Sequence, residues 1–208
     1  LAGVYDVTIT DNVGCQITGS FTVIEPTVLA LSNTSVDVTC NVGTNGSINL
    51  NVTGGTSPYT YAWTGPNGFT ATSQDISTLE AGSYDVIVTD NNTCTQTTSI
   101  TINEPAAIVI TETLTDADCN GASTGEIALN IVGGTPAYTY SWTGPNGFNS
   151  GVEDITGLAA GTYDLALTDG NGCPATGSYV IGEPTAIGLT PSSTASNCGQ
   201  ADGSVGVV

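Results

Sequence analysis

The sequence repeats itself every 79 residues, and this duplication constrains the fold more than any other feature. Aligned without a gap, residues 27–105 and 106–184 are identical at 37 of their 79 positions. The alignment predicts the C-terminal part of a truncated repeat at 1–26, complete repeats at 27–105 and 106–184, and the N-terminal part of a truncated repeat at 185–208. Because both end segments are fragments of a repeat, we expect the natural chain to continue in both directions.

The length of the repeat favours a small independent domain. A period of 79 residues exceeds the roughly 20 to 50 typical of solenoid units and suits a β-sandwich of just under ~100 residues. Segments of alternating apolar and polar residues are separated by Gly, Pro and Asn turn signals, and no segment predicts a helix. In the first complete repeat the expected strands are 28–38, 47–53, 59–64, 74–79, 84–89 and 95–102. The sequence thus predicts an all-β fold of tandem immunoglobulin-like sandwiches, similar to polycystic-kidney-disease or fibronectin-III domains, in an extended array.

The charge composition restricts the function. The chain has no Lys, Arg or His and has 19 acidic residues, giving a net charge of −19. Without cationic side chains it cannot bind nucleic acid through counterion release, nor attach electrostatically to an anionic membrane. The missing His and Lys also remove the usual general bases, so we expect no enzyme. At 39% hydrophobic residues the chain can bury a core, and no apolar run is long enough for direct membrane insertion.

Two aromatic motifs recur at the repeat spacing. The pattern Leu-x-x-Gly-x-Tyr predicts a tyrosine corner, in which a hydroxyl closes a turn by bonding the backbone. The corner residues are Tyr5, Tyr84 and Tyr163. The second motif is a Tyr-x-Tyr-x-Trp strand whose three aromatic side chains share one face, formed by Tyr59, Tyr61 and Trp63 and by Tyr138, Tyr140 and Trp142. Core packing is the simpler interpretation, and a platform for stacking sugar rings is the alternative.

The six cysteines indicate an oxidising, extracellular setting, since no close Cys-x-x-Cys pair or histidine suggests zinc. Each strand carries the chain from one end of the sandwich to the other. The number of strands between two cysteines therefore decides whether they lie at the same end. Four strands between Cys40 and Cys94 bring both to one end of the sandwich, and this count, which we prefer, predicts disulfides Cys40–Cys94 and Cys119–Cys173. A fifth strand around residues 68–72 would instead separate them and place Cys40 near Cys173 of the following domain. Pairing each late cysteine with the next early one (Cys15–Cys40, Cys94–Cys119, Cys173–Cys198) would use all six, but suits an extended chain poorly.

Carboxylates recur in three positions of the repeat. One follows the corner tyrosine, one opens the last loop and one precedes the junction proline. These are Asp6, Asp85 and Asp164, then Asp11, Asp90 and Asp169, then Glu25, Glu104 and Glu183. We interpret the loop aspartates as Asx turns and the junction glutamates as solvated charges. The alternative is Ca²⁺ at the junctions. No other cofactor is expected.

The combined motifs resemble the SprB repeat family. The matching elements are Gly-Gly-Thr-x-x-Tyr-Thr-Tyr-x-Trp, Leu-x-Ala-Gly-x-Tyr-Asp, Thr-Asp-x-Asn-x-Cys and a closing Glu-Pro, with a longer Gly65–Phe69 insertion than many such repeats carry. The resemblance implies a segment of a very large bacterial cell-surface adhesin, exported by type 9 secretion and serving adhesion or gliding motility. It also implies a stalk whose partners are neighbouring repeats of the same chain, with surface glycans or other cell-surface proteins as further partners. A glycan-binding module and a self-assembling filament are the alternatives.

Overall fold

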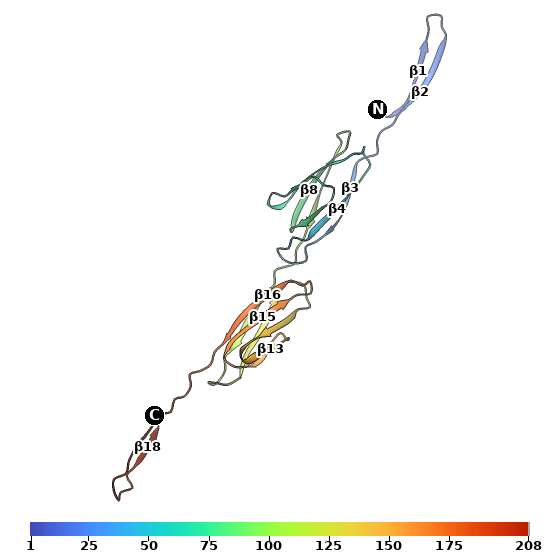
Figure 1. The fold of residues 1–208 in the computed structure, drawn as a ribbon. Coiled ribbons are helices and arrows are strands. Elements are labelled where there is room, and N and C mark those ends of the chain that lie inside the picture. The colour runs from blue at the N-terminus through green and yellow to red at the C-terminus, as the bar shows by residue number, and fades with distance from the viewer. Residues whose placement is uncertain (208) are drawn as a thin grey trace. The chain divides into compact units, whose positions relative to one another are not determined.

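The computed structural model describes residues 1–207. They form two compact units, and the boundary lies between Ala106 and Ala107. Each unit contains one seven-stranded β-sandwich and one separate two-stranded hairpin (Figure 1). The predicted complete repeats 27–105 and 106–184 hold the two sandwiches.

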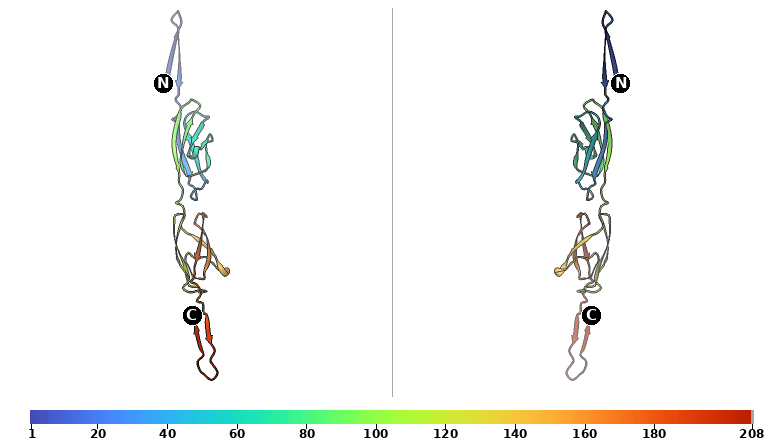
Figure 2. Two further views of the ribbon diagram at one scale, coloured as in Figure 1. Left: turned by 90° about the vertical axis from the view of Figure 1, so that its left-hand side faces the viewer. Right: turned by 90° about the vertical axis from the view of Figure 1, so that its right-hand side faces the viewer.

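The first sandwich has a three-stranded and a four-stranded antiparallel sheet (Figure 2). In the smaller sheet, β4 (Gly46–Thr53) lies between β3 (Ala30–Val36) and β7 (Ile76–Leu79). The larger sheet has the order β6 (Thr70–Ala71), β5 (Thr60–Thr64), β8 (Gly82–Thr89) and β9 (Thr95–Ile102). The chain crosses repeatedly from one sheet to the other, as in immunoglobulin-like domains.

The second sandwich repeats this topology 79 residues later. Its smaller sheet contains β10 (Val109–Thr115), β11 (Gly125–Val132) and β14 (Ile155–Leu158), in that order. Its larger sheet has the order β13 (Asn149–Ser150), β12 (Thr139–Thr143), β15 (Gly161–Thr168) and β16 (Pro174–Ile181).

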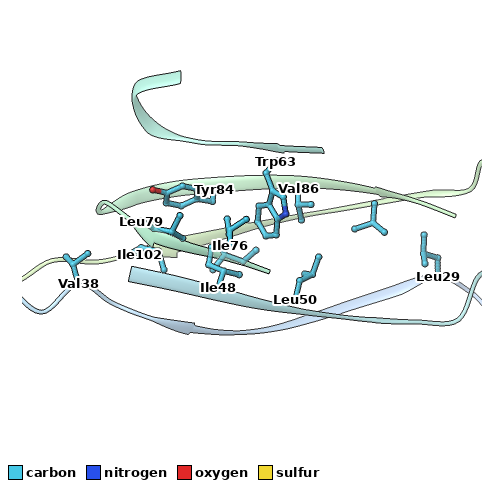
Figure 3. Close-up of a cluster of buried hydrophobic side chains, with 12 residues drawn as sticks. Leu29, Val38, Ile48, Leu50, Trp63, Ile76, Leu79, Tyr84, Val86 and Ile102 are labelled. Carbon is cyan, nitrogen blue, oxygen red and sulfur yellow. The ribbon is translucent and has the colours of Figure 1, made fainter. Parts of the chain in front are cut away.

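The core of each sandwich comes from the period-2 alternation of its strands. Tyr84, Val86 and Val88 point inward from β8 and are at most 2% exposed, while Asp85 and Ile87 between them face solvent. The indole of Trp63 enters from β5, above the side chains of the smaller sheet (Figure 3). Fully burying an apolar side chain contributes roughly 1.5 to 3 kcal/mol, so each unit carries the main source of its own stability.

One strand was missing from the expected set. Residues Pro66–Gly68 form a single 3₁₀ turn, after which β6 pairs with β5 through Trp63 opposite Ala71. Five strands therefore separate Cys40 from Cys94, where we had preferred four. The same turn and short strand occur in the second unit, at Pro145–Gly147 and β13.

The two hairpins correspond to parts of the same sandwich. Strands β1 (Gly3–Thr10) and β2 (Gln16–Val23) align with β8 and β9, while β17 (Pro191–Thr194) and β18 (Ser204–Val207) align with β3 and β4. Tyr5 is 48% exposed, whereas its equivalent Tyr84 is 2% exposed. A hairpin alone has no second sheet to cover its apolar face.

Candidate functional site at the ends of each repeat

The Glu-Pro segment that closes each repeat is bound to the loop containing the early cysteine. The backbone N–H of Val42 donates to Oε2 of Glu104 at 2.6 Å, and the Asn41 amide donates to the carbonyl of Pro105 at 3.2 Å. In the second unit, the Gly121 N–H donates to Glu183 at 2.6 Å and Asn120 donates to Pro184 at 3.2 Å. Both glutamates are exposed, as expected of solvated charges, and each is in addition an acceptor for a loop 62 residues earlier.

The geometry of this loop depends on one residue with positive φ. Val42 has φ +57°, and its equivalent Gly121 has φ +75°. This left-handed conformation favours glycine and is unusual for a β-branched side chain. It turns the backbone N–H toward the glutamate in both copies. The sequence offered one signal for this site, the Cys-Asn dipeptide at the same position of both repeats.

At the opposite end of the sandwich, the loop aspartate holds the late cysteine. Oδ1 of Asp90 accepts from the N–H groups of Asn92 and Cys94, both at 2.8 Å, and Oδ2 accepts from Thr56 at 2.8 Å. Asp169 makes the equivalent bonds to Asn171, Cys173 and Thr135. Burial alone would raise the pKa of Asp90, but these backbone hydrogen bonds together hold it below its ordinary value. The Asp169 pKa is also lowered, chiefly by the Thr135 N–H. Both residues form the Asx turn expected for this loop.

The predicted disulfide pairs are not formed. Cys94 and Cys119 are exposed free thiols, as are Cys15 and Cys198. Cys40 and Cys173 are in the disulfide form. The physical reason is β6, the fifth strand, which puts Cys40 and Cys94 at opposite ends of one sandwich. The preferred pairs Cys40–Cys94 and Cys119–Cys173 were therefore wrong, since each needed both cysteines at the same end.

Each corner tyrosine closes a turn by bonding the backbone carbonyl of the residue four positions before it. The hydroxyl of Tyr84 donates to the carbonyl of Glu80 at 3.0 Å, and Tyr163 bonds Ala159 at the same distance. Tyr5 makes the equivalent bond to Leu1 at 2.6 Å. The following aspartates Asp6, Asp85 and Asp164 are exposed on the outer face of their strands.

The aromatic strand packs into the core. Trp63 and Trp142 are each 1% exposed, and their indole N–H groups donate to backbone carbonyls of Ser73 and Val152 at 2.9 Å. Neither ring offers a face to a sugar. The hydroxyls of Tyr59 and Tyr138 bond Gly54 and Gly133, and Tyr61 bonds Gln74. Burial, with a hydrogen bond to Glu153, raises the pKa of Tyr140 to about 12.

Metal ligands do not converge within the part of the chain that the structure describes. No group of three or more Cys, Asp or Glu side chains is placed to hold a metal ion among residues 1–207. At the junctions, Glu104 and Asp90 accept backbone N–H groups instead. None of the described helices is both long and apolar enough to cross a membrane.

These features define a tandem pair of immunoglobulin-like β-sandwiches closed by Glu-Pro junctions. The family model of the SprB repeat matches the chain twice, at residues 32–68 and 111–147. The chain is therefore similar to the SprB repeat over one segment of each sandwich. No curated protein matches the sequence.

Solved structures similar to this chain contain immunoglobulin domains. The N-terminal eight Ig domains of Down Syndrome Cell Adhesion Molecule (isoform 1.30.30) match with 16% identity and a TM-score of 0.43, covering 88% of this chain and 28% of that one. The amphioxus IgVJ-C2 molecule matches with 15% identity and a TM-score of 0.31, covering 72% and 95%. The present chain thus spans little more than a quarter of the first of these structures.

Proposed function

We propose that this chain is a stalk segment of a very large secreted bacterial cell-surface adhesin, which serves adhesion or gliding motility after export by type 9 secretion. The two matches to the SprB repeat model support this proposal. In this role each sandwich is a spacer, and an adhesive element elsewhere in the protein makes the contact with the target.

The observation that carries the proposal is the attachment of Glu104 and Pro105 to the Cys40 loop. Because this attachment makes the Glu-Pro segment part of the first sandwich, little free linker remains before Ile108, whose side chain packs on the second core. Proline further restricts the backbone at the junction. A short and restricted linker limits rotation between successive domains, which is what a stalk requires.

Recognition of glycans by the aromatic strand has less support, because Trp63 and Trp142 are buried. A glycan array probed with the 208-residue chain separates the two roles. We expect no binding. Specific binding of a glycan would contradict the proposed stalk role and would support a glycan-recognition module.

Nitrogen-15 relaxation of the 208-residue chain, with all cysteines reduced, tests the stiffness of the junction. We expect the two sandwiches to share one rotational correlation time. Glu104→Ala removes the acceptor for Val42 and should shorten the correlation times of both units without unfolding either. Glu126→Ala removes the same charge from an exposed strand position and should leave the correlation time unchanged. Independent tumbling of the two units in the unsubstituted chain would refute a semi-rigid stalk.

A further inference from the structure

Two copies of one hexapeptide form the turn before the short strand of each sandwich. Residues 64–69 and 143–148 both read Thr-Gly-Pro-Asn-Gly-Phe. The asparagines have the same left-handed backbone, with φ +52° and ψ +27° at Asn67 and φ +56° and ψ +26° at Asn146. Both asparagines and the glycines that follow them are exposed. Local sequence and backbone geometry therefore give the two Asn-Gly pairs the same intrinsic reactivity.

The side chains of the two asparagines differ in their partners. The amide nitrogen Nδ2 of Asn67 donates to Oε2 of Glu80 at 2.8 Å. The residue equivalent to Glu80 in the second sandwich is Ala159, whose side chain has no acceptor. Among residues 1–207, the Asn146 side chain has no hydrogen-bond partner. The amide of Asn67 is thus restrained, and that of Asn146 is free to rotate.

The other three Asn-Gly pairs of the chain are restrained as well. In each of them the side-chain amide of the asparagine donates a hydrogen bond at 2.9 Å to another residue. These asparagines are Asn45, Asn120 and Asn171, and the acceptors belong to Thr39, Glu183 and Thr135. Of the five Asn-Gly pairs in the described part of the chain, the pair at Asn146 is therefore the one with an unrestrained amide.

We propose that Asn146 is a site of spontaneous modification, where the Asn-Gly pair deamidates while the other four pairs are protected. The backbone nitrogen of Gly147 attacks Cγ of Asn146 and forms an N–Cγ bond. The Cγ–Nδ2 bond breaks, and Nδ2 leaves as ammonia with the proton of the Gly147 N–H. Water then opens the five-membered succinimide ring at either carbonyl, adding its hydroxyl to carbon and its proton to nitrogen. The products are aspartate and isoaspartate, and solvent water is the only co-reactant.

The hydrogen bond to Glu80 opposes the first step at Asn67. Its amide must leave the carboxylate before Cγ can reach the backbone nitrogen of Gly68, whereas the amide of Asn146 has no such bond to break. The net free energy of one hydrogen bond corresponds to a factor of roughly two to ten in rate.

Deamidation would change the turn of the second sandwich in two ways. It adds a negative charge at an exposed position, and isoaspartate lengthens the backbone by one carbon just before β13. Phe148, two residues further on, packs its ring edge to face on the corner residue Tyr163. A repeat with alanine at the position of Ala159 would thus age at this turn, and a repeat with glutamate there would be protected.

Mass spectrometry of the aged protein tests the proposal. The 208-residue chain is incubated at mildly alkaline pH and cut after glutamate, which gives one peptide that ends at Glu80 and another at 127–153. Each peptide contains one of the two turns, and its fragmentation locates the deamidated residue. We expect Asn146 to deamidate roughly two- to tenfold faster than Asn67. In urea both should react at the same rate, because their local sequences are identical.

Substitutions in both directions separate the hydrogen bond from other differences between the sandwiches. Glu80→Ala removes the acceptor and should raise the rate at Asn67 to that at Asn146. Ala159→Glu supplies an acceptor and should lower the rate at Asn146. Asp85→Ala is the matched control, since it removes one charge from an exposed position of the first sandwich, and should change neither rate.

Three outcomes would overturn the proposal. The first is an equal rate at Asn67 and Asn146 in the folded chain. The second is a Glu80→Ala chain in which Asn67 still reacts more slowly than Asn146. The third is a difference between the two sites that persists in urea, because its cause would then lie outside the folded structure.

Discussion

Several carboxylates of this chain are stabilised by hydrogen bonds from backbone N–H groups, in place of the ion pairs that Lys or Arg would provide. Asp37 accepts the N–H of Asn103 at 2.8 Å, and Asp75 accepts that of Leu50 at 3.0 Å. The second unit repeats these bonds with Asp116 and Asp154. A carboxylate that accepts backbone N–H groups is stabilised in its charged form. A chain without Lys or Arg can therefore still use its acidic residues to fix loops.

Asp90 gives this arrangement a measurable pH dependence. Its folded-state pKa is lowered from an ordinary value of 3.8, so the unfolded chain binds the proton more readily. The stability that Asp90 contributes is complete above about pH 4 and is lost as pH falls through the folded pKa. We expect Asp90→Asn to lower the stability of the first unit at pH 7 and to weaken its loss of stability on acidification.

Urea unfolding at pH 7 and at pH 2.5 provides the measurement. A Trp142→Phe background leaves Trp63 to report on the first unit alone. Asp85→Asn is the control, because Asp85 is exposed on β8, the strand that precedes Asp90, and it should keep the original pH dependence. If Asp90→Asn also left the pH dependence unchanged, the hydrogen bonds to Asp90 would contribute nothing to the stability of the first unit.

At the scale of the elements, the turn before each short strand packs against the corner tyrosine. The ring of Phe148 contacts that of Tyr163 edge to face, with 5.2 Å between centroids. Gly144, at the start of the turn, leaves no room for a side chain, since an added Cβ would lie 2.5 Å from the Tyr163 ring. The turn thereby fixes where β13 begins.

Substitution of this glycine should be costly. We expect Gly144→Ala to destabilise the second unit by roughly 1 to 3 kcal/mol, as overpacking of a filled site usually does. Gly151→Ala is the control, because its Cβ would meet only the Tyr140 carbonyl at 3.7 Å. Thermal unfolding of both variants in a Trp63→Phe background, followed by the fluorescence of Trp142, compares them. Equal midpoints would mean that the Tyr163 ring can move aside without cost.

The long strands were predictable and the short one was not. Residues 84–89 alternate apolar and polar side chains over a full strand, so their pattern predicts both the strand and its buried face. Thr70–Ala71 and Asn149–Ser150 are two-residue strands, too short for any periodicity to show. This omission reversed the strand parity and led to the wrong cysteine pairs. The bond from Val42 to Glu104 was also hidden, because it joins residues 62 positions apart through a backbone group.

At the scale of the whole molecule, each sandwich has a buried core of its own, formed by residues of one complete repeat. Separate cores confine damage. A substitution or a proteolytic cut that unfolds one sandwich leaves the core of the other in place, so a chain of such repeats would lose its domains one at a time.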